Sequence, residues 1–183
     1  GLEQLIALDL NGDAHEDLAV ACYSSDSVEL FHGQGNGTFS PEGVIGGLSG
    51  GPQDLIAGDF NSDGLQDLLV MTLWAGAYSL EGDGTGGFDA PVKFTALNNG
   101  ILLRSADLDC DGNLDVVTVT SGAPSVFFGA GDGSFSEPVT YPAPFTTYAL
   151  GLVDLDRDGA IDLLTAGNPV EGPRVAVAWN DGG

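Results

Sequence analysis

One aspartate-rich segment of nine residues occurs four times in the sequence, and its spacing limits the possible folds more than any other feature. The first aspartates of successive copies are 50, 48 and 47 residues apart. Self-similarity at such a period is typical of repeat architectures, in which each copy forms one supersecondary unit. The segments, called Asp loops below, are Asp9–Asp17, Asp59–Asp67, Asp107–Asp115 and Asp154–Asp162. We therefore expect one domain or domain segment with repeats at about 1–48, 49–98, 99–145 and 146–183.

Short apolar runs surround each Asp loop and predict β-strands. One run precedes the loop, a second follows it, and a third lies beyond a turn. A glycine turn that ends in phenylalanine, such as Gly131–Phe135, leads to a weaker fourth run. The lengths and compositions favour strands, and no segment has a helical period. Four antiparallel strands in roughly 50 residues match one blade of a β-propeller.

The fourth repeat stops at 180–183, before its phenylalanine and its last strand. The predicted fold is therefore all-β, a β-propeller of four-stranded antiparallel blades, with three complete blades and three strands of a fourth. Three arrangements remain open: a piece of a larger propeller, a propeller closed by four blades, or an assembly of copies.

Oxygen-bearing side chains occupy the first, third, fifth and ninth positions of each Asp loop. Neighbouring carboxylates repel one another unless a cation lies between them, and calcium takes six to eight oxygen ligands. Glycine at the sixth position (Gly64, Gly112, Gly159) permits the positive φ of a sharp turn. Ala14 replaces it in the first loop, which predicts a strained or altered turn and a weaker site. The predicted cofactor is calcium, with up to four ions.

Neither an EF-hand nor an ordinary turn fits the Asp loops as well as a repeated calcium site does. An EF-hand would need a glutamate at the twelfth position and flanking helices, whereas this chain has valine or threonine there and strand-forming flanks. Ordinary turns rich in Asp, Asn and Gly would explain one copy, but less readily four at equivalent places.

These residues resemble the FG-GAP/VCBS repeats of integrin-α-like β-propellers, in which DxNxDGxxDL is followed by GNGDGTF. The resemblance implies that each Asp loop joins the first two strands of a blade and binds calcium. It assigns the side-chain ligands Asp9, Asn11, Asp13 and Asp17; Asp59, Asn61, Asp63 and Asp67; Asp107, Asp109, Asp111 and Asp115; and Asp154, Asp156, Asp158 and Asp162. The implied backbone carbonyl ligands belong to His15, Leu65, Asn113 and Ala160.

The charge balance excludes several partners. The formal net charge is −23, with only four lysines and arginines. Nucleic acid is therefore not expected as a partner, and neither is an anionic membrane surface. No apolar run approaches the ~20 residues that span a bilayer. Because extracellular calcium modules bind at roughly 10⁻⁴–10⁻³ M, we expect an extracellular, secreted or cell-surface location.

Three residues are candidates for ligand binding. Tyr23 and Trp74 fall on the rim opposite the Asp loops, where aromatic rings suit a sugar or a protein partner. The favoured alternative is that these aromatic rings cap the ends of the blades. Arg104 lies in an innermost strand and would face the central channel or pair with a nearby acid. Cys22 and Cys110 are expected to be unpaired, and 36–38 is a glycosylation acceptor if the source is eukaryotic.

The expected function is a calcium-stabilised scaffold for binding or adhesion, with a protein or glycan partner and no catalytic site. No nucleophile elbow or zinc-type histidine cluster is present. The glycine pattern Gly82–Gly87 precedes Phe88–Pro91 rather than a helix, which argues against a dinucleotide site. The alternatives are a lectin, a non-catalytic propeller segment of a secreted hydrolase or lyase, and a structural protein that self-associates through unpaired strand edges.

Overall fold

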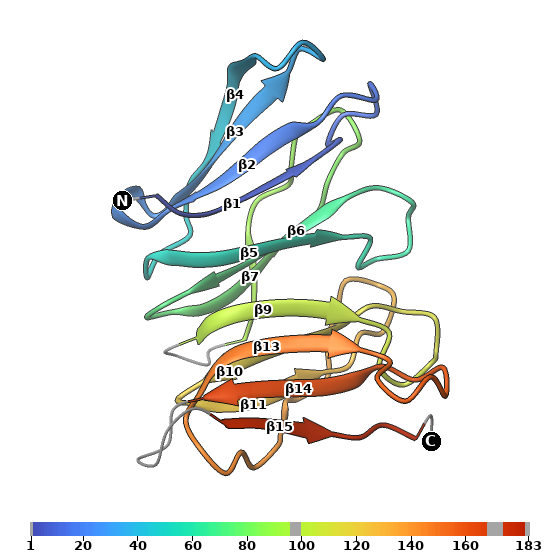
Figure 1. Ribbon diagram of the computed structural model, residues 1–183. Coiled ribbons are helices and arrows are strands. Elements are labelled where there is room, and N and C mark those ends of the chain that lie inside the picture. The colour runs from blue at the N-terminus through green and yellow to red at the C-terminus, as the bar shows by residue number, and fades with distance from the viewer. Residues whose placement is uncertain (1, 96–99, 168–173, 182–183) are drawn as a thin grey trace. The chain divides into compact units, whose positions relative to one another are not determined.

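The computed structural model describes residues 2–95, 100–167 and 174–181, which form β-strands, one short 3-10 helix η1 (Tyr23–Ser25) and connecting loops (Figure 1). The first sheet contains β1 (Leu2–Leu8), β2 (Asp17–Cys22), β3 (Ser27–Gly33) and β4 (Phe39–Ile45). The second contains β5 (Pro52–Gly58), β6 (Asp67–Thr72), β7 (Gly76–Leu80) and β8 (Val92–Thr95). The third contains β9 (Gly100–Ala106), β10 (Asp115–Thr120), β11 (Ala123–Phe127) and β12 (Val139–Thr140). The fourth contains β13 (Thr147–Val153), β14 (Asp162–Gly167) and β15 (Arg174–Ala178).

Each sheet is an antiparallel meander in chain order, with neighbouring strands joined by hydrogen bonds. Within the described residues, three sheets have four strands and the last has three, which confirms the predicted blades. The first apolar run of each repeat, for example residues 5–10, predicts a strand that ends two residues later than the observed one. Leu10 lies in the Asp loop, where its N–H donates to the Asp17 carboxylate rather than to a neighbouring strand.

Contacts within the chain define two compact units, each described by itself. The first contains residues 1–59 and 63–100, and the second contains 60–62 and 101–183. In the first unit, β1 and β2 contact β5, and the core includes Val28, Leu55 and Leu68. In the second, β10 contacts β13 over a core that includes Leu108 and Val117.

The second strand of each blade is the most buried one. All six residues of β6 are buried, as are the first five of β10, whereas β4 is mostly exposed. A strand covered on both faces requires a nearly continuous apolar sequence, which explains the apolar run after every Asp loop. The buried strands therefore hold one end of each loop rigidly in place.

Both cysteines are free, Cys22 buried and Cys110 exposed. Burial raises the pKa of the Cys22 thiol, which therefore remains protonated at neutral pH. The part of the chain that the structure describes contains no helix with the length and apolar character needed to cross a bilayer.

Candidate metal-binding loops

The ninth residue of every Asp loop is a buried aspartate that connects three strand ends. Asp115 is 0% exposed, and its Oδ2 accepts the N–H of Leu108 at 2.7 Å. Its Oδ1 accepts the N–H of Gly129 at 2.8 Å, just beyond β11. Asp17 and Asp162 make the same pair of bonds, and Asp67 bonds to the N–H after β7. This aspartate thus joins the Asp loop, the start of the second strand and the end of the third.

The aspartates at the first and fifth positions of each Asp loop shape its backbone. Asp107 Oδ1 accepts the N–H of Asp111 at 3.1 Å, and its Oδ2 accepts the N–H of Gly112 at 3.0 Å. The fifth-position carboxylate accepts the N–H of the seventh residue at 2.8 Å in all four loops. The donors are the predicted carbonyl ligands His15, Leu65, Asn113 and Ala160. Backbone N–H groups therefore preset the loops around their carboxylates.

Two positions in each loop have left-handed backbone. At the sixth position φ is +67° for Ala14 and between +86° and +99° for the three glycines. The first loop is thus strained rather than turned differently. The fourth position is also left-handed, with φ of +77° at Gly12 and +60° to +68° in the other copies. Sequence reasoning missed this position, because only one of its four residues is a glycine.

Replacing Ala14 by glycine is expected to stabilise the metal-free protein by roughly 0.5–1 kcal/mol. Left-handed backbone costs an L-residue roughly 1–2 kcal/mol, and the greater freedom of glycine in the unfolded chain offsets part of that gain. Urea denaturation measures the difference, with Ala14→Val as the control that should be less stable than the wild type. A loss of stability in Ala14→Gly would contradict the assigned strain.

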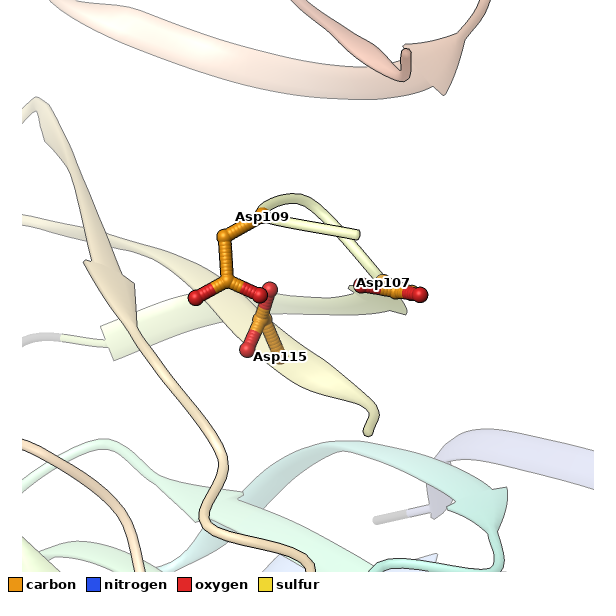
Figure 2. Close-up of side chains that lie close together, drawn as sticks. All are labelled: Asp107, Asp109 and Asp115. Carbon is orange, nitrogen blue, oxygen red and sulfur yellow. The ribbon is translucent and has the colours of Figure 1, made fainter. Parts of the chain in front are cut away.

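Three carboxylates come together in each of the third and fourth loops. Asp107, Asp109 and Asp115 each offer an oxygen within 4.8 Å of the others (Figure 2). Asp154, Asp156 and Asp162 form the equivalent triplet. The fifth-position residues Asp111 and Asp158 lie outside these triplets and bond to the loop backbone. In the first two loops the third position is an asparagine, Asn11 or Asn61.

Each triplet places one buried carboxylate beside one partly buried and one exposed carboxylate, so negative charge is concentrated there. Burial raises the pKa of Asp115, N–H donors offset part of this rise, and Asp109 and Asp111 add repulsion. Loss of hydration likewise raises the pKa of Asp156, and neighbouring aspartates reinforce the rise. In the first loop, by contrast, the N–H of Ala14 lowers the pKa of Asp9. A divalent cation would relieve the repulsion in the third and fourth loops, so their residues fit a hard metal ion.

The first loop has a neighbour that sequence reasoning missed, the imidazole of His32. Its Nδ1 lies 3.2 Å from Asp17 Oδ1 and 2.7 Å from the Asn11 amide nitrogen, and its Nε2 lies 3.5 Å from Asp13 Oδ2. Aligning the first three repeats on Gly33, Gly82 and Gly129 would have placed His32 beside the loop.

At or just beyond the end of the third strand, three blades have a glycine, because a carbonyl occupies the space of a side chain. A Cβ at Gly33, Gly82 or Gly129 would collide with the carbonyl oxygen of the eighth loop residue. In the fourth blade this residue is Asn180, whose side-chain amide donates to the equivalent carbonyl of Ile161 at 3.2 Å.

Replacing Gly129 by alanine is expected to lower the free energy of unfolding by about 2 kcal/mol, because the added methyl group must displace backbone. Urea denaturation checks this value. Gly46→Ala is the matched control, since a Cβ there meets nothing within 4 Å. Equal effects of the two substitutions would show that the carbonyl does not constrain Gly129.

Two predicted ligand-binding residues meet in the first unit. The Trp74 indole Nε1–H donates to Tyr23 Oη at 3.3 Å, and Trp74 is 61% exposed. Both follow second strands, at the end opposite the Asp loops. Arg104 belongs to β9 in the second unit, where it is half-buried and donates to the Leu103 carbonyl at 2.5 Å.

Residues 9–70 and 107–165 match the family model of the FG-GAP-like repeat. These ranges make up more than half of the chain and include all four Asp loops. The sequence has no match among curated proteins.

Several solved structures share the fold. An Agrocybe aegerita lectin that recognises non-reducing terminal N-acetylglucosamine has a TM-score of 0.67 at 22% identity, over 96% of this chain and 52% of the lectin. BBS1N in complex with ARL6DN has a TM-score of 0.62 at 14% identity, over 98% and 51%. The catalytic domain of Coprinopsis cinerea GH62 α-L-arabinofuranosidase has a TM-score of 0.59 at 15% identity, over 97% and 63%. The chain thus spans about half the length of the first two, and identities this low establish the fold alone.

Proposed function

Because the chain belongs to the FG-GAP-like repeat family, we propose that it is a calcium-stabilised binding scaffold. The observation that supports this most directly is the pair of carboxylate triplets, each with oxygens within 4.8 Å of one another. A bound calcium ion would offset the repulsion between these carboxylate oxygens.

The residues of each Asp loop would have different roles in holding the ion. The ninth aspartate is already fixed by backbone N–H groups, so it forms the rigid side of the site. Asp107 and Asp109 belong to the loop before β10, and holding them against Asp115 would fasten the β9–β10 hairpin. The rims of blades stiffened in this way would then present their loops to a partner.

Calcium titration of the metal-free chain by calorimetry tests this proposal. The double variant Asp109→Ala/Asp156→Ala removes one exposed carboxylate from each triplet. We expect it to bind two fewer ions than the wild type. Asp89→Ala/Asp181→Ala is the control, because it removes equal charge at exposed positions outside the Asp loops. Unchanged stoichiometry in the first variant, or no calcium binding by the wild type, would refute the assignment.

Carbohydrate recognition is a second candidate function, favoured by the Tyr23–Trp74 pair. An exposed indole held by a neighbouring hydroxyl is a rigid face for a sugar ring, and one structural neighbour is a lectin. A glycan array with the wild type, Trp74→Ala and Trp179→Ala tests it. We expect loss of binding only in Trp74→Ala, since Trp179 lies in the other unit. An array without signal would leave a protein as the proposed partner.

A non-catalytic role and an extracellular location are part of the same proposal. The clustered carboxylates bond to the loop backbone and are arranged around a common centre, which suits a metal ion better than a sugar bond. Release of arabinose from an aryl arabinofuranoside would contradict the non-catalytic assignment. Self-association remains the structural alternative, and light scattering that shows a monomer would exclude it.

A further inference from the structure

One blade packs on the next through the same repeat positions in both units. In the first unit, β1 and β2 contact β5, and apolar side chains from the two sheets form one core. The first blade contributes Leu8, Leu10, Ala19, Val28 and Leu30, and the second contributes Leu55, Ala57, Leu68, Leu80 and Phe88. The core of the second unit contains residues at the same positions, among them Leu108 and Val117 of the third blade and Leu150 and Leu163 of the fourth. A blade thus presents one apolar set to the blade after it and the other set to the blade before it.

The first blade exposes the set that the second blade buries. Strand register and repeat spacing identify the equivalent residues of the first blade. These residues, called the start face below, are Leu5, Ala7, Leu18, Phe31 and Phe39. Leu5 is 56% exposed, whereas its equivalent Leu55 is 1% exposed. The start face is therefore an apolar surface with the composition of a buried blade interface.

The fourth blade exposes the other set. Its residues at the matching positions, called the end face below, are Val153, Leu155, Leu164, Val175 and Val177. Val175 is 69% exposed, whereas its equivalent Val28 in the first blade is 0% exposed. Contiguous exposed apolar side chains of this kind mark interaction surfaces.

The glycine turn of a blade adds a specific contact with the Asp loop of the blade before it. In the second unit, the Gly133 N–H donates to the Phe60 carbonyl at 3.1 Å, and the Phe135 and Phe60 rings meet edge to face at 6.1 Å between centroids. Phe60 is the second residue of its Asp loop, and the equivalent residue of the fourth loop is Leu155. Leu155 is 47% exposed, whereas the second residues of the other three loops are 4–9% exposed.

The first blade has the matching turn already in place. The N–H of Gln34 donates to the Thr38 carbonyl at 3.0 Å, as the N–H of Ala130 does to the Ser134 carbonyl in the third blade. Phe39 ends this turn, as Phe135 ends the turn of the third blade, and it is 44% exposed. An exposed aromatic ring in the first blade thus matches an exposed leucine in the fourth.

We infer that the end face of one copy of this chain packs against the start face of a second copy, with Phe39 of one copy on Leu155 of the other. The faces are complementary because the same repeat positions already pack on each other inside each unit. The chain covers 52% of the lectin and 51% of BBS1N, so two copies together supply the length of either structure. This contact joins sheet faces rather than strand edges, and it does not depend on calcium binding.

The contact is heterologous, because it joins two different surfaces, and a heterologous contact is tested by mixing variants. Leu5→Glu changes the start face and Val175→Glu the end face, both at exposed positions. Val92→Glu is the matched control, since it adds the same charge at a 63% exposed position of β8, outside both faces. Sedimentation velocity over a range of protein concentrations measures the association, and circular dichroism checks that each variant is folded.

We expect the wild type and Val92→Glu to associate, and each face variant alone to associate at least ~10-fold more weakly, because a carboxylate would be buried without a partner. An equimolar mixture of Leu5→Glu and Val175→Glu should form a dimer, since one intact end face and one intact start face remain in the mixture. The formal net charge of each copy is −23, so added salt should strengthen association by screening the repulsion between copies.

Three results would overturn the inference: a wild type that is monomeric at every protein and salt concentration, face variants that associate as the wild type does, or a mixture of the two variants that stays monomeric. Repeating the measurements with calcium and with a chelator separates this inference from the calcium proposal. Calcium binding by a monomeric wild type would refute the inference alone. Association of a wild type that binds no calcium would refute only the proposed function.

Discussion

Replacing Asp115 by alanine is expected to lower the free energy of unfolding of the metal-free protein by about 3 kcal/mol. The side chain is 0% exposed and accepts the N–H groups of Leu108 and Gly129 at 2.7 and 2.8 Å. Its removal leaves two backbone donors without their acceptor, and each unsatisfied buried donor costs roughly 1–3 kcal/mol. Relief of the burial that raises the pKa of Asp115 offsets part of the loss.

Urea denaturation in the presence of a chelator measures this effect without a metal contribution. Asp111→Ala is the control, because it removes the same charge from an exposed position of the same loop. We expect that control to cost less than about 1 kcal/mol, as for other exposed hydrogen bonds. If the two variants were equally stable, the buried aspartate would not connect the strand ends as described.

Removing calcium is expected to lower the free energy of unfolding by about 3 kcal/mol when free calcium is initially ~10-fold above the dissociation constant. Each occupied site then stabilises the fold by about 1.4 kcal/mol, and the third and fourth loops supply two sites with clustered carboxylates. For a chain of this length, ~3 kcal/mol corresponds to a change in melting temperature of roughly 6–12 °C. Thermal melts with calcium and with a chelator measure the difference.

The double variant Asp109→Ala/Asp156→Ala is the control for calcium removal and should lose most of the shift. Equal melting temperatures of the wild type with calcium and with chelator would rule out calcium as a stabilising ligand.

Acid should also reduce the calcium-dependent shift in melting temperature, because the pKa values of Asp115 and Asp156 are raised in the fold. Protonation of these two carboxyl groups stabilises the metal-free fold at low pH, and this stabilisation is lost as pH rises through the raised pKa values. Protons and calcium therefore compete for the same oxygens.

The repeat pattern by itself determined most of the fold. Strand identity depends on local composition, and the 47–50-residue spacing places four equivalent hairpins in one chain. The repeat length also predicted the three strands of the fourth sheet. The Asp-loop pattern predicted the carboxylates that cluster in the third and fourth loops. These features are local or periodic, so a single sequence contains them.

Only the tertiary structure decided which residues act together. Asp115 and Gly129 are 14 residues apart and Tyr23 and Trp74 are 51 apart, and strand pairing and blade packing bring each pair into contact. His32 reaches the first loop for the same reason, because β3 ends beside the start of β2. Periodicity shows that residues are equivalent between repeats. Contacts between distant residues depend on register and on side-chain direction, which are set when the strands pair and pack.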